Sequence, residues 1–126
     1  MNGFFLVNKG YGDSSNFVVQ EIKKTFSFEK VGHLGTLDPA AEGLLIVAIN
    51  RATKFSNYFL NADKSYDVSV ELGVSTNTDD ATGEVIYESQ NIPKKQKIIE
   101  EIKKFKGISM QKPPFFSALK HKGKPL

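Results

Sequence analysis

Apolar runs and one alternating stretch predict four β-strands. Residues 3–8 and 44–49 are largely apolar runs of strand length, which is typical of strands that lie in a core. Residues 65–73 alternate between apolar and polar side chains, as a strand with one buried face does. Residues 84–88 follow a turn-rich stretch, and we expect them to return as a strand.

Apolar residues at helical spacing predict three helices. The first follows Asp13, Ser14 and Ser15, any of which can cap it. The second is expected over residues 51–62 and the third over residues 94–106. The apolar positions on these helices are Phe17, Val18, Ile22 and Phe26; Phe55, Tyr58, Phe59 and Ala62; and Ile98, Ile99, Ile102 and Phe105.

An irregular segment, residues 31–43, precedes the second apolar run, and we expect the chemistry there. Gly32 and Gly35 permit backbone angles that are closed to other residues, and Pro39 fixes the backbone after Asp38. Asp38 is the one acid enclosed by these turn residues. A stiff loop anchored to a core strand can hold a side chain in one direction, so Asp38 is the candidate catalytic residue.

The length and the rare residue types narrow the class of protein. A chain of 126 residues fits one domain with a single core. The absence of cysteine excludes a disulfide framework and a thiol nucleophile, and two lone histidines make a histidine metal cluster unexpected. No apolar run approaches the length that a bilayer needs, and the start lacks the features of a signal peptide. We therefore expect an unsecreted cytoplasmic protein.

Charge is distributed unevenly along the chain. The net charge is +3, yet from Lys94 onward there are ten lysines against two acids. The first 93 residues carry seven basic and twelve acidic groups. The basic end is therefore the natural candidate to meet phosphates, although a lysine-rich helix face exposed to solvent explains any single lysine equally well.

Asp79 and Asp80 stand together in the turn-rich stretch, which invites a metal-binding interpretation. A calcium loop needs oxygen ligands at alternating positions and a distant glutamate, and this pattern is absent. We therefore favour a hairpin turn here and predict no metal site.

The pattern Gly-His-x-Gly-Thr-Leu-Asp-Pro-x-x-x-Gly at residues 32–43 closely resembles the catalytic motif of the TruB family of tRNA pseudouridine synthases. Three further stretches resemble the same family, in the same order along the chain. They are the loop with Lys9, Gly12, Ser14 and Ser15, in which Gly10 replaces the usual proline; the stretch from Tyr66 to Leu72-Gly73 that leads into the acidic turn; and Gln-x-Pro-Pro-x-aromatic-Ser-Ala-x-Lys at residues 111–120.

The resemblance implies that residues 1–126 form the N-terminal portion of a pseudouridine synthase catalytic domain, with no second domain present. The expected fold is α+β, with a mixed, mostly antiparallel sheet and helices packed on it. Strands from both halves of the family domain build that sheet. We therefore expect a partial sequence and an incomplete sheet with an exposed edge.

The activity that the resemblance implies is isomerisation of uridine to pseudouridine in the T-loop of tRNA, at position 55. Asp38 would be the ionised carboxylate that acts on a flipped-out uridine. The reaction transfers no electrons and adds no external group, so we expect no cofactor. The expected partner is the T-arm stem-loop of tRNA, and the protein is expected to be a monomer that needs neither membrane nor metal.

Five residues are candidates to contact the RNA. Tyr66 matches the family tyrosine that stacks on the flipped base, and His33 matches the histidine that meets the RNA loop. Without the resemblance, Tyr66 would be an ordinary inward-facing strand residue and His33 a turn residue. Lys9, Lys64 and Lys120 are candidates to neutralise phosphates.

Two alternatives remain open. The family pairs its aspartate with an arginine from a later Gly-Thr-Tyr-Ile-Arg-like segment, which these 126 residues do not contain. The chain could accordingly be a non-catalytic RNA-binding fragment. A guide-RNA-dependent relative of the family shares the aspartate loop, but such relatives usually carry an N-terminal extension, whereas here the first strand is expected from Gly3.

Overall fold

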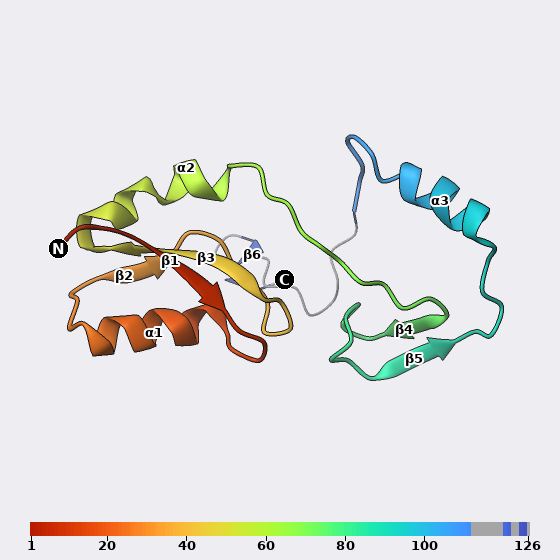
Figure 1. The fold of residues 1–126 in the computed structure, drawn as a ribbon, viewed down its shortest axis with the longest axis horizontal. Helices are drawn as coiled ribbons and strands as arrows, with labels where there is room; N and C mark the ends of the chain where they lie inside the picture. The colour runs from red at the N-terminus through yellow and green to blue at the C-terminus, as the bar shows by residue number, and fades with distance from the viewer. Residues whose placement is uncertain (112–119, 122–123, 126) are drawn as a thin grey trace. The chain divides into compact units, whose positions relative to one another are not determined.

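Figure 1 shows the fold as a computed structural model that describes residues 1–111, 120–121 and 124–125. The chain divides into two compact units, Met1–Asp67 and Val68–Leu126. Most of the expected Gln-x-Pro-Pro segment, residues 112–119, lies outside the described residues. None of the described helices is both long and apolar enough to cross a membrane.

The first unit is a three-stranded antiparallel sheet with helices on its two faces. The strand order is β1-β3-β2, so that β3 is central. Gly3 pairs with Ile49 and Lys9 with Gly43 on one side of β3, while His33 pairs with Val47 on the other side. The elements are β1 (Gly3–Lys9), α1 (Ser15–Thr25), β2 (Val31–His33), β3 (Gly43–Ile49), a 3-10 helix η1 (Asn50–Phe55) and α2 (Ser56–Leu60).

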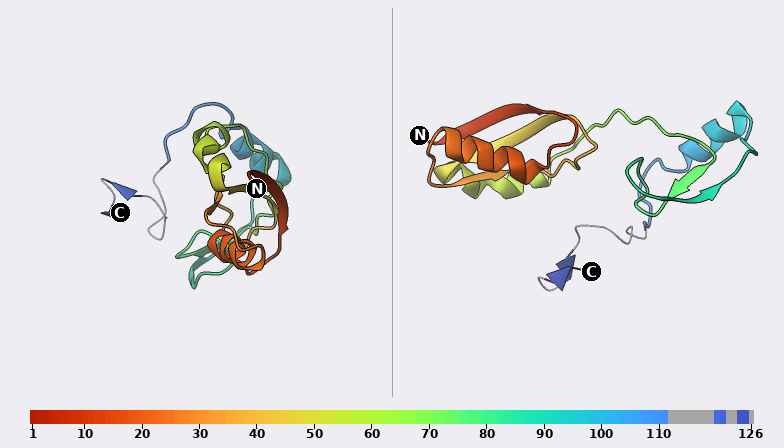
Figure 2. Two further views of the ribbon diagram at one scale, coloured as in Figure 1. Left: turned by 90° about the vertical axis from the view of Figure 1, so that its left-hand side faces the viewer. Right: turned by 90° about the horizontal axis from the view of Figure 1, so that it is seen from below.

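Alternate residues of β3 face two different apolar clusters. Leu45, Val47 and Ile49 are buried against Val19 of α1. Ala48 faces the opposite side, where Phe59 of α2 packs beside it. Figure 2 shows the two helices on opposite faces of the sheet. Because α1 covers one face of β3 and Phe59 of α2 packs on part of the other, its sequence is a continuous apolar run and not an alternating one.

The structure confirms the strands expected at residues 3–8 and 44–49, although β1 is buried on one face only. Its Leu6 side chain is 73% exposed, because the sheet face beyond α2 is uncovered. The short strand β2 was not predicted, because Gly32 interrupts its apolar pattern. Only its pairing with the central strand defines it, and such pairing between distant segments leaves no local signal.

The helices of the first unit follow the predicted spacing with two differences. Ser14 is the residue that caps α1, since its hydroxyl accepts a hydrogen bond of 3.1 Å from the Phe17 N–H. Val19, which was not among the predicted apolar positions, is the buried hydrophobic residue of that helix. The helix expected over residues 51–62 is instead the 3-10 helix η1 followed by the short helix α2.

The second unit contains an antiparallel hairpin and one helix. Strand β4 (Val74–Thr76) pairs with β5 (Val85–Glu88), and α3 spans Lys95–Lys103. A further pair joins β6 (Lys120–His121) to β7 (Lys124–Pro125). Every strand pairing in the described part of the chain is antiparallel, and the expected α+β class with an antiparallel sheet is confirmed.

The strand predicted over residues 65–73 is wrong. Residues 63–71 have no regular structure, and Tyr66, Val68 and Val70 are exposed. No backbone to backbone hydrogen bond involves residues 63–72 within the described part of the chain. Alternation gives a segment two faces, but a strand also requires a neighbour to pair with, and pairing begins only at Val74.

The acidic turn between β4 and β5 is held by its own side chains, as a hairpin turn. The Asp80 carboxylate accepts hydrogen bonds from the Thr78 hydroxyl at 2.7 Å and from the Thr82 N–H at 2.8 Å. The Thr82 hydroxyl donates a third, at 2.6 Å. These bonds, led by that of the Thr82 side chain, lower the pKa of Asp80 because they favour its charged form.

Leu44 and Leu45 offer a matched test of the core. Leu45 is 1% exposed and Leu44 is 63% exposed on the same strand. Leu45→Ala should lower the free energy of unfolding by about 2–5 kcal/mol, because it leaves a cavity in the α1 face. Leu44→Ala should change it by less than about 0.5 kcal/mol. Urea unfolding of both variants measures this difference, and equal losses would contradict the assignment of the core.

Acid should weaken the β4-β5 turn. Because the pKa of folded Asp80 lies below its ordinary value of 3.8, its ionised form stabilises the turn above that value. This stabilisation is lost as the pH falls through the folded pKa. Thr82→Ala should raise the pKa of Asp80 toward the ordinary value, as an NMR titration of the carboxyl would measure. A titration midpoint that stays where it is in wild type would refute the hydrogen-bond explanation.

Candidate active site

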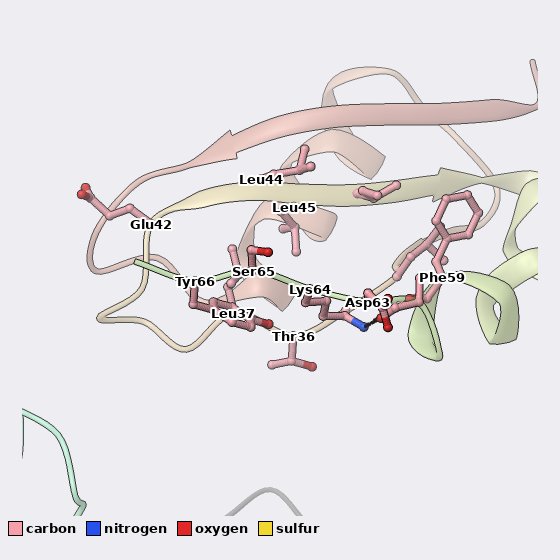
Figure 3. Close-up of a pocket in the computed structure, with 14 residues that line it drawn as sticks. Thr36, Leu37, Glu42, Leu44, Leu45, Phe59, Asp63, Lys64, Ser65 and Tyr66 are labelled. Atoms are coloured by element: carbon pink, nitrogen blue, oxygen red, sulfur yellow. Dashed lines mark hydrogen bonds between the residues drawn. The ribbon is translucent and has the colours of Figure 1, made fainter. Parts of the chain in front are cut away.

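A cavity of about 290 Å³ lies in the first unit beside the loop that carries Asp38. Figure 3 shows its walls: Thr36 and Leu37 come from the loop, Leu44 from β3, and Phe59 from α2. Tyr66 also lines it. The volume is at the small end of the range for small-molecule sites, and the lining is mostly apolar with a few polar groups at its edge. We refer to it as the pocket.

Asp38 follows the pocket residues Gly35, Thr36 and Leu37 directly in the chain, and its side chain is exposed. Its carbonyl oxygen accepts a hydrogen bond of 2.9 Å from the Ala41 N–H, which makes a turn after it. The loop forms no strand ladder of its own at this point. Its geometry must therefore come from other parts of the unit.

The residue before Asp38 is held by a buried serine at the start of α1. The Ser15 hydroxyl donates to the Leu37 carbonyl at 2.8 Å and accepts from the Leu37 N–H at 2.9 Å. Ser15 is only 3% exposed. A single side chain thus satisfies both backbone groups of Leu37.

The residue after Asp38 is held by the loop that follows β1. The Pro39 carbonyl accepts from the Gly12 N–H at 2.8 Å and from the Lys9 ammonium at 3.5 Å. The same ammonium donates to the carbonyls of Gly10 at 2.9 Å and Asp13 at 2.7 Å. Asp38 therefore lies between two anchored neighbours.

Lys9 is 1% exposed, and its charge is satisfied by three backbone carbonyls. A buried ammonium needs such partners, because an unpaired buried charge is strongly unfavourable. This placement does not favour the predicted contact between Lys9 and a phosphate. Its position indicates that it joins the loop after β1 to the Asp38 loop.

His33 ends β2 and lies half-buried. Its Nδ1 is 2.9 Å from the Gly35 carbonyl oxygen. Because a carbonyl can only accept, Nδ1 carries the proton in this contact, which leaves Nε2 as an acceptor in the neutral ring. The hydrogen bond fixes the orientation of the ring against the turn that leads into the pocket.

Lys64 lies on the pocket wall and binds the end of α2 (Figure 3). Its ammonium donates to the carbonyls of Phe59 at 3.3 Å, Leu60 at 3.0 Å and Ala62 at 3.0 Å. A cation at a helix C-terminus satisfies carbonyls that have no partner within the helix. Lys64 is nevertheless exposed, unlike Lys9.

The predicted residues are thus brought together in part. Tyr66 and Lys64 line the pocket, and Asp38 lies next to its lining residues in the chain. Tyr66 is 63% exposed, so it is not the inward-facing strand residue of the alternative interpretation. Lys120 belongs to the second unit, where the structure describes only its backbone in β6.

Sequence reasoning missed the role of Ser15. The sequence does contain a hint of this role, because Ser14 and Ser15 stand together and one helix needs only one of them as its cap. Because Ser14 makes the cap, the second hydroxyl is available for another contact. Glu42 was also missed: it lines the pocket and accepts a hydrogen bond of 3.1 Å from the Tyr11 N–H.

Comparison with known proteins identifies relatives of the whole chain. It is 46% identical to tRNA pseudouridine synthase B of Mannheimia succiniciproducens and 48% identical to that of Blochmanniella floridana, over 126 residues in both cases. All of this chain is covered, but only 41% and 49% of these relatives. The chain therefore spans less than half of their length.

A solved structure and a family model agree with these matches. A chain in the crystal structure of a Cbf5-Nop10-Gar1 complex has a TM-score of 0.62 and 30% identity, over 94% of this chain and 31% of that one. Residues 23–126 match the model of the TruB family pseudouridylate synthase N-terminal domain, which includes the Asp38 loop and the pocket wall at Tyr66. The resemblance seen in the motifs is confirmed, and the chain belongs to the TruB family of pseudouridylate synthases.

Proposed function

We propose that this chain carries the catalytic centre of an isomerase that converts uridine to pseudouridine in the T-loop of tRNA, at position 55, with Asp38 as the catalytic carboxylate. The names of the relatives, tRNA pseudouridine synthase B, support the reaction and the class of RNA. The position within the tRNA and the role of Asp38 rest on the motif at residues 32–43. We further propose that residues 1–126 are the N-terminal portion of the catalytic domain.

The reaction rearranges one bond without a net change of atoms. The bond between C1′ of the ribose and N1 of uracil breaks, the base rotates, and C1′ bonds to C5. C5 loses its proton to solvent, and N1 gains one. A carboxylate beside the sugar or base can act as a nucleophile or stabilise the positive charge that develops at C1′, as carboxylates do in glycoside hydrolysis.

The observation that carries the proposal is the pair of anchors on either side of Asp38. Leu37 is fixed through Ser15, and Pro39 is fixed through Gly12 and Lys9, while the Asp38 side chain is exposed. A carboxylate that is held by its backbone and open to solvent can meet a large substrate without a search through loop conformations. Such positioning is a main source of catalytic rate.

The pocket is suited to bind a uracil base that has flipped out of the base stack of the RNA. Its apolar walls, Leu37, Leu44 and Phe59, offer the surface that a flipped base requires, and the exposed ring of Tyr66 is available to stack on it. We propose that His33 contacts the RNA loop through Nε2. Lys64 and Lys120 are proposed as phosphate contacts.

The proposed substrate is a cytoplasmic RNA, and we propose that the protein acts there as a monomer. A non-catalytic RNA-binding role would predict the same affinity without turnover, which the first experiment below distinguishes. The guide-RNA-dependent alternative is less favoured, because identity to the tRNA pseudouridine synthase B relatives reaches 44–48%.

Asp38→Asn should abolish turnover without loss of binding. The amide keeps the shape of the side chain but removes its charge and nucleophilicity, so we expect a rate loss on the order of 10⁴-fold or more. Release of tritium from C5-labelled uridine in a tRNA transcript measures turnover, and filter binding measures affinity. The protein should be used at the length that its reading frame encodes.

Asp67→Asn is the matched control for Asp38→Asn, since Asp67 is exposed and does not line the pocket. It should retain the wild-type rate. Turnover by Asp38→Asn near the wild-type rate would exclude Asp38 as the catalyst. Tight binding without turnover by the wild-type protein would instead support the RNA-binding alternative.

Lys9→Met should separate anchoring from phosphate binding. Loss of an ammonium that donates to carbonyls should lower the free energy of unfolding by about 1.5–3 kcal/mol. The slope of log affinity for tRNA against log salt concentration should remain as in wild type. A phosphate contact would instead reduce that slope by about one.

A further inference from the structure

We infer that Ser15 is a positioning residue for the Asp38 carboxylate. This inference rests on the proposed function and assigns a role in it to a residue outside the Asp38 loop. Ser15 is the first residue of α1, 22 positions before Leu37 in the chain, and is buried. Its hydroxyl makes both of its hydrogen bonds with Leu37 and none with the helix.

The two bonds constrain Leu37 in the way that a paired strand would. A hydroxyl has one proton to donate, and here that proton goes to the Leu37 carbonyl. A lone pair of the same oxygen receives the Leu37 N–H. Rotation of the Leu37 backbone would break at least one of these bonds and leave the buried Ser15 hydroxyl without that partner, which is unfavourable.

Peptide planarity extends the constraint to Asp38. The Leu37 carbonyl lies in one rigid plane with the N and Cα atoms of Asp38. Fixing that carbonyl therefore fixes the point from which the Asp38 side chain departs. On the other side, the Pro39 ring locks its own φ, and the Pro39 carbonyl is bonded to Gly12.

Ser15 also connects the carboxylate to the rigid part of the unit. Four residues along α1, Val19 packs in the apolar cluster of β3 with Leu45 and Val47. A helix with a side chain in the core cannot shift independently of the sheet. The position of the Asp38 backbone is therefore set relative to the pocket wall that begins at Leu44 on the same strand as Leu45 and Val47.

Ser14 provides the control that the test needs. It is adjacent, carries the same side chain and stabilises the same helix through the Phe17 N–H, but it makes no contact with Leu37. Ser14→Ala and Ser15→Ala should both reduce stability. Only Ser15→Ala should alter the alignment of Asp38, whereas Ser15→Thr keeps the hydroxyl and should restore it.

The experiment is a single-turnover assay of tritium release, with each variant in saturating excess over the C5-labelled tRNA transcript. Under this condition the rate constant reports the folded enzyme and does not depend on the fraction that is folded. Ser15→Ala should lower it by about 10- to 100-fold, because a misplacement near 1 Å has an effect of that size. Affinity for tRNA should change by less than about threefold, and Ser14→Ala should keep the wild-type rate constant.

Amide hydrogen exchange of Leu37 in the wild-type protein gives a second measurement that needs no variant. Its N–H should be protected although it lies in a loop, because Ser15 holds it. Rapid exchange would overturn the inference, as would a wild-type rate constant in Ser15→Ala or an equal loss in Ser14→Ala. A wild-type protein that forms no pseudouridine would refute the proposed function, whereas an active wild type with an unaffected Ser15→Ala would refute this inference alone.

Discussion

The hydrogen bonds from residues 9–15 to Leu37 and Pro39 are the constraint on which the site depends. The Asp38 loop has neither helix nor ladder at this point, so its backbone polar groups must find partners elsewhere. They find them in Lys9 at the end of β1, in Gly12 of the loop that follows, and in Ser15 at the start of α1. Because that strand and that helix both pack on β3, the geometry of the loop follows from the packing of the core.

The pocket lies at the part of the sheet that α2 does not cover. On one face, α1 covers β3 fully enough to bury Leu45 and Val47. On the other face, α2 has five residues and reaches Ala48 through Phe59, but it leaves Leu44 exposed. A short helix over a longer strand therefore leaves apolar surface uncovered beside the Asp38 loop. In the proposed function, this apolar surface is the part of the protein that a flipped base would contact.

Local patterns made much of this architecture predictable. The apolar run at residues 44–49, the capped helix after Ser14 and the acidic turn at Asp80 are each determined by residues close in sequence. The Asp38 loop was also recognisable, since its glycines and proline adjoin it. The contacts that fix the loop were not predictable, because Lys9 lies 30 residues from Pro39 and no periodicity links them.

The failed strand at residues 65–73 shows how the two sides of the site differ. Apolar and polar residues alternate there, but residues 65–72 are all exposed and no described strand pairs with them, so Tyr66 has no ladder to hold it. The hydrogen bonds that hold this segment near Tyr66 are those from the Lys64 ammonium to the carbonyls at the end of α2. The Asp38 side is therefore anchored through buried groups, and the Tyr66 side through one exposed ammonium. Local opening requires the least free energy where few hydrogen bonds must break, so less free energy should be needed to open the Tyr66 wall than to displace the Asp38 loop.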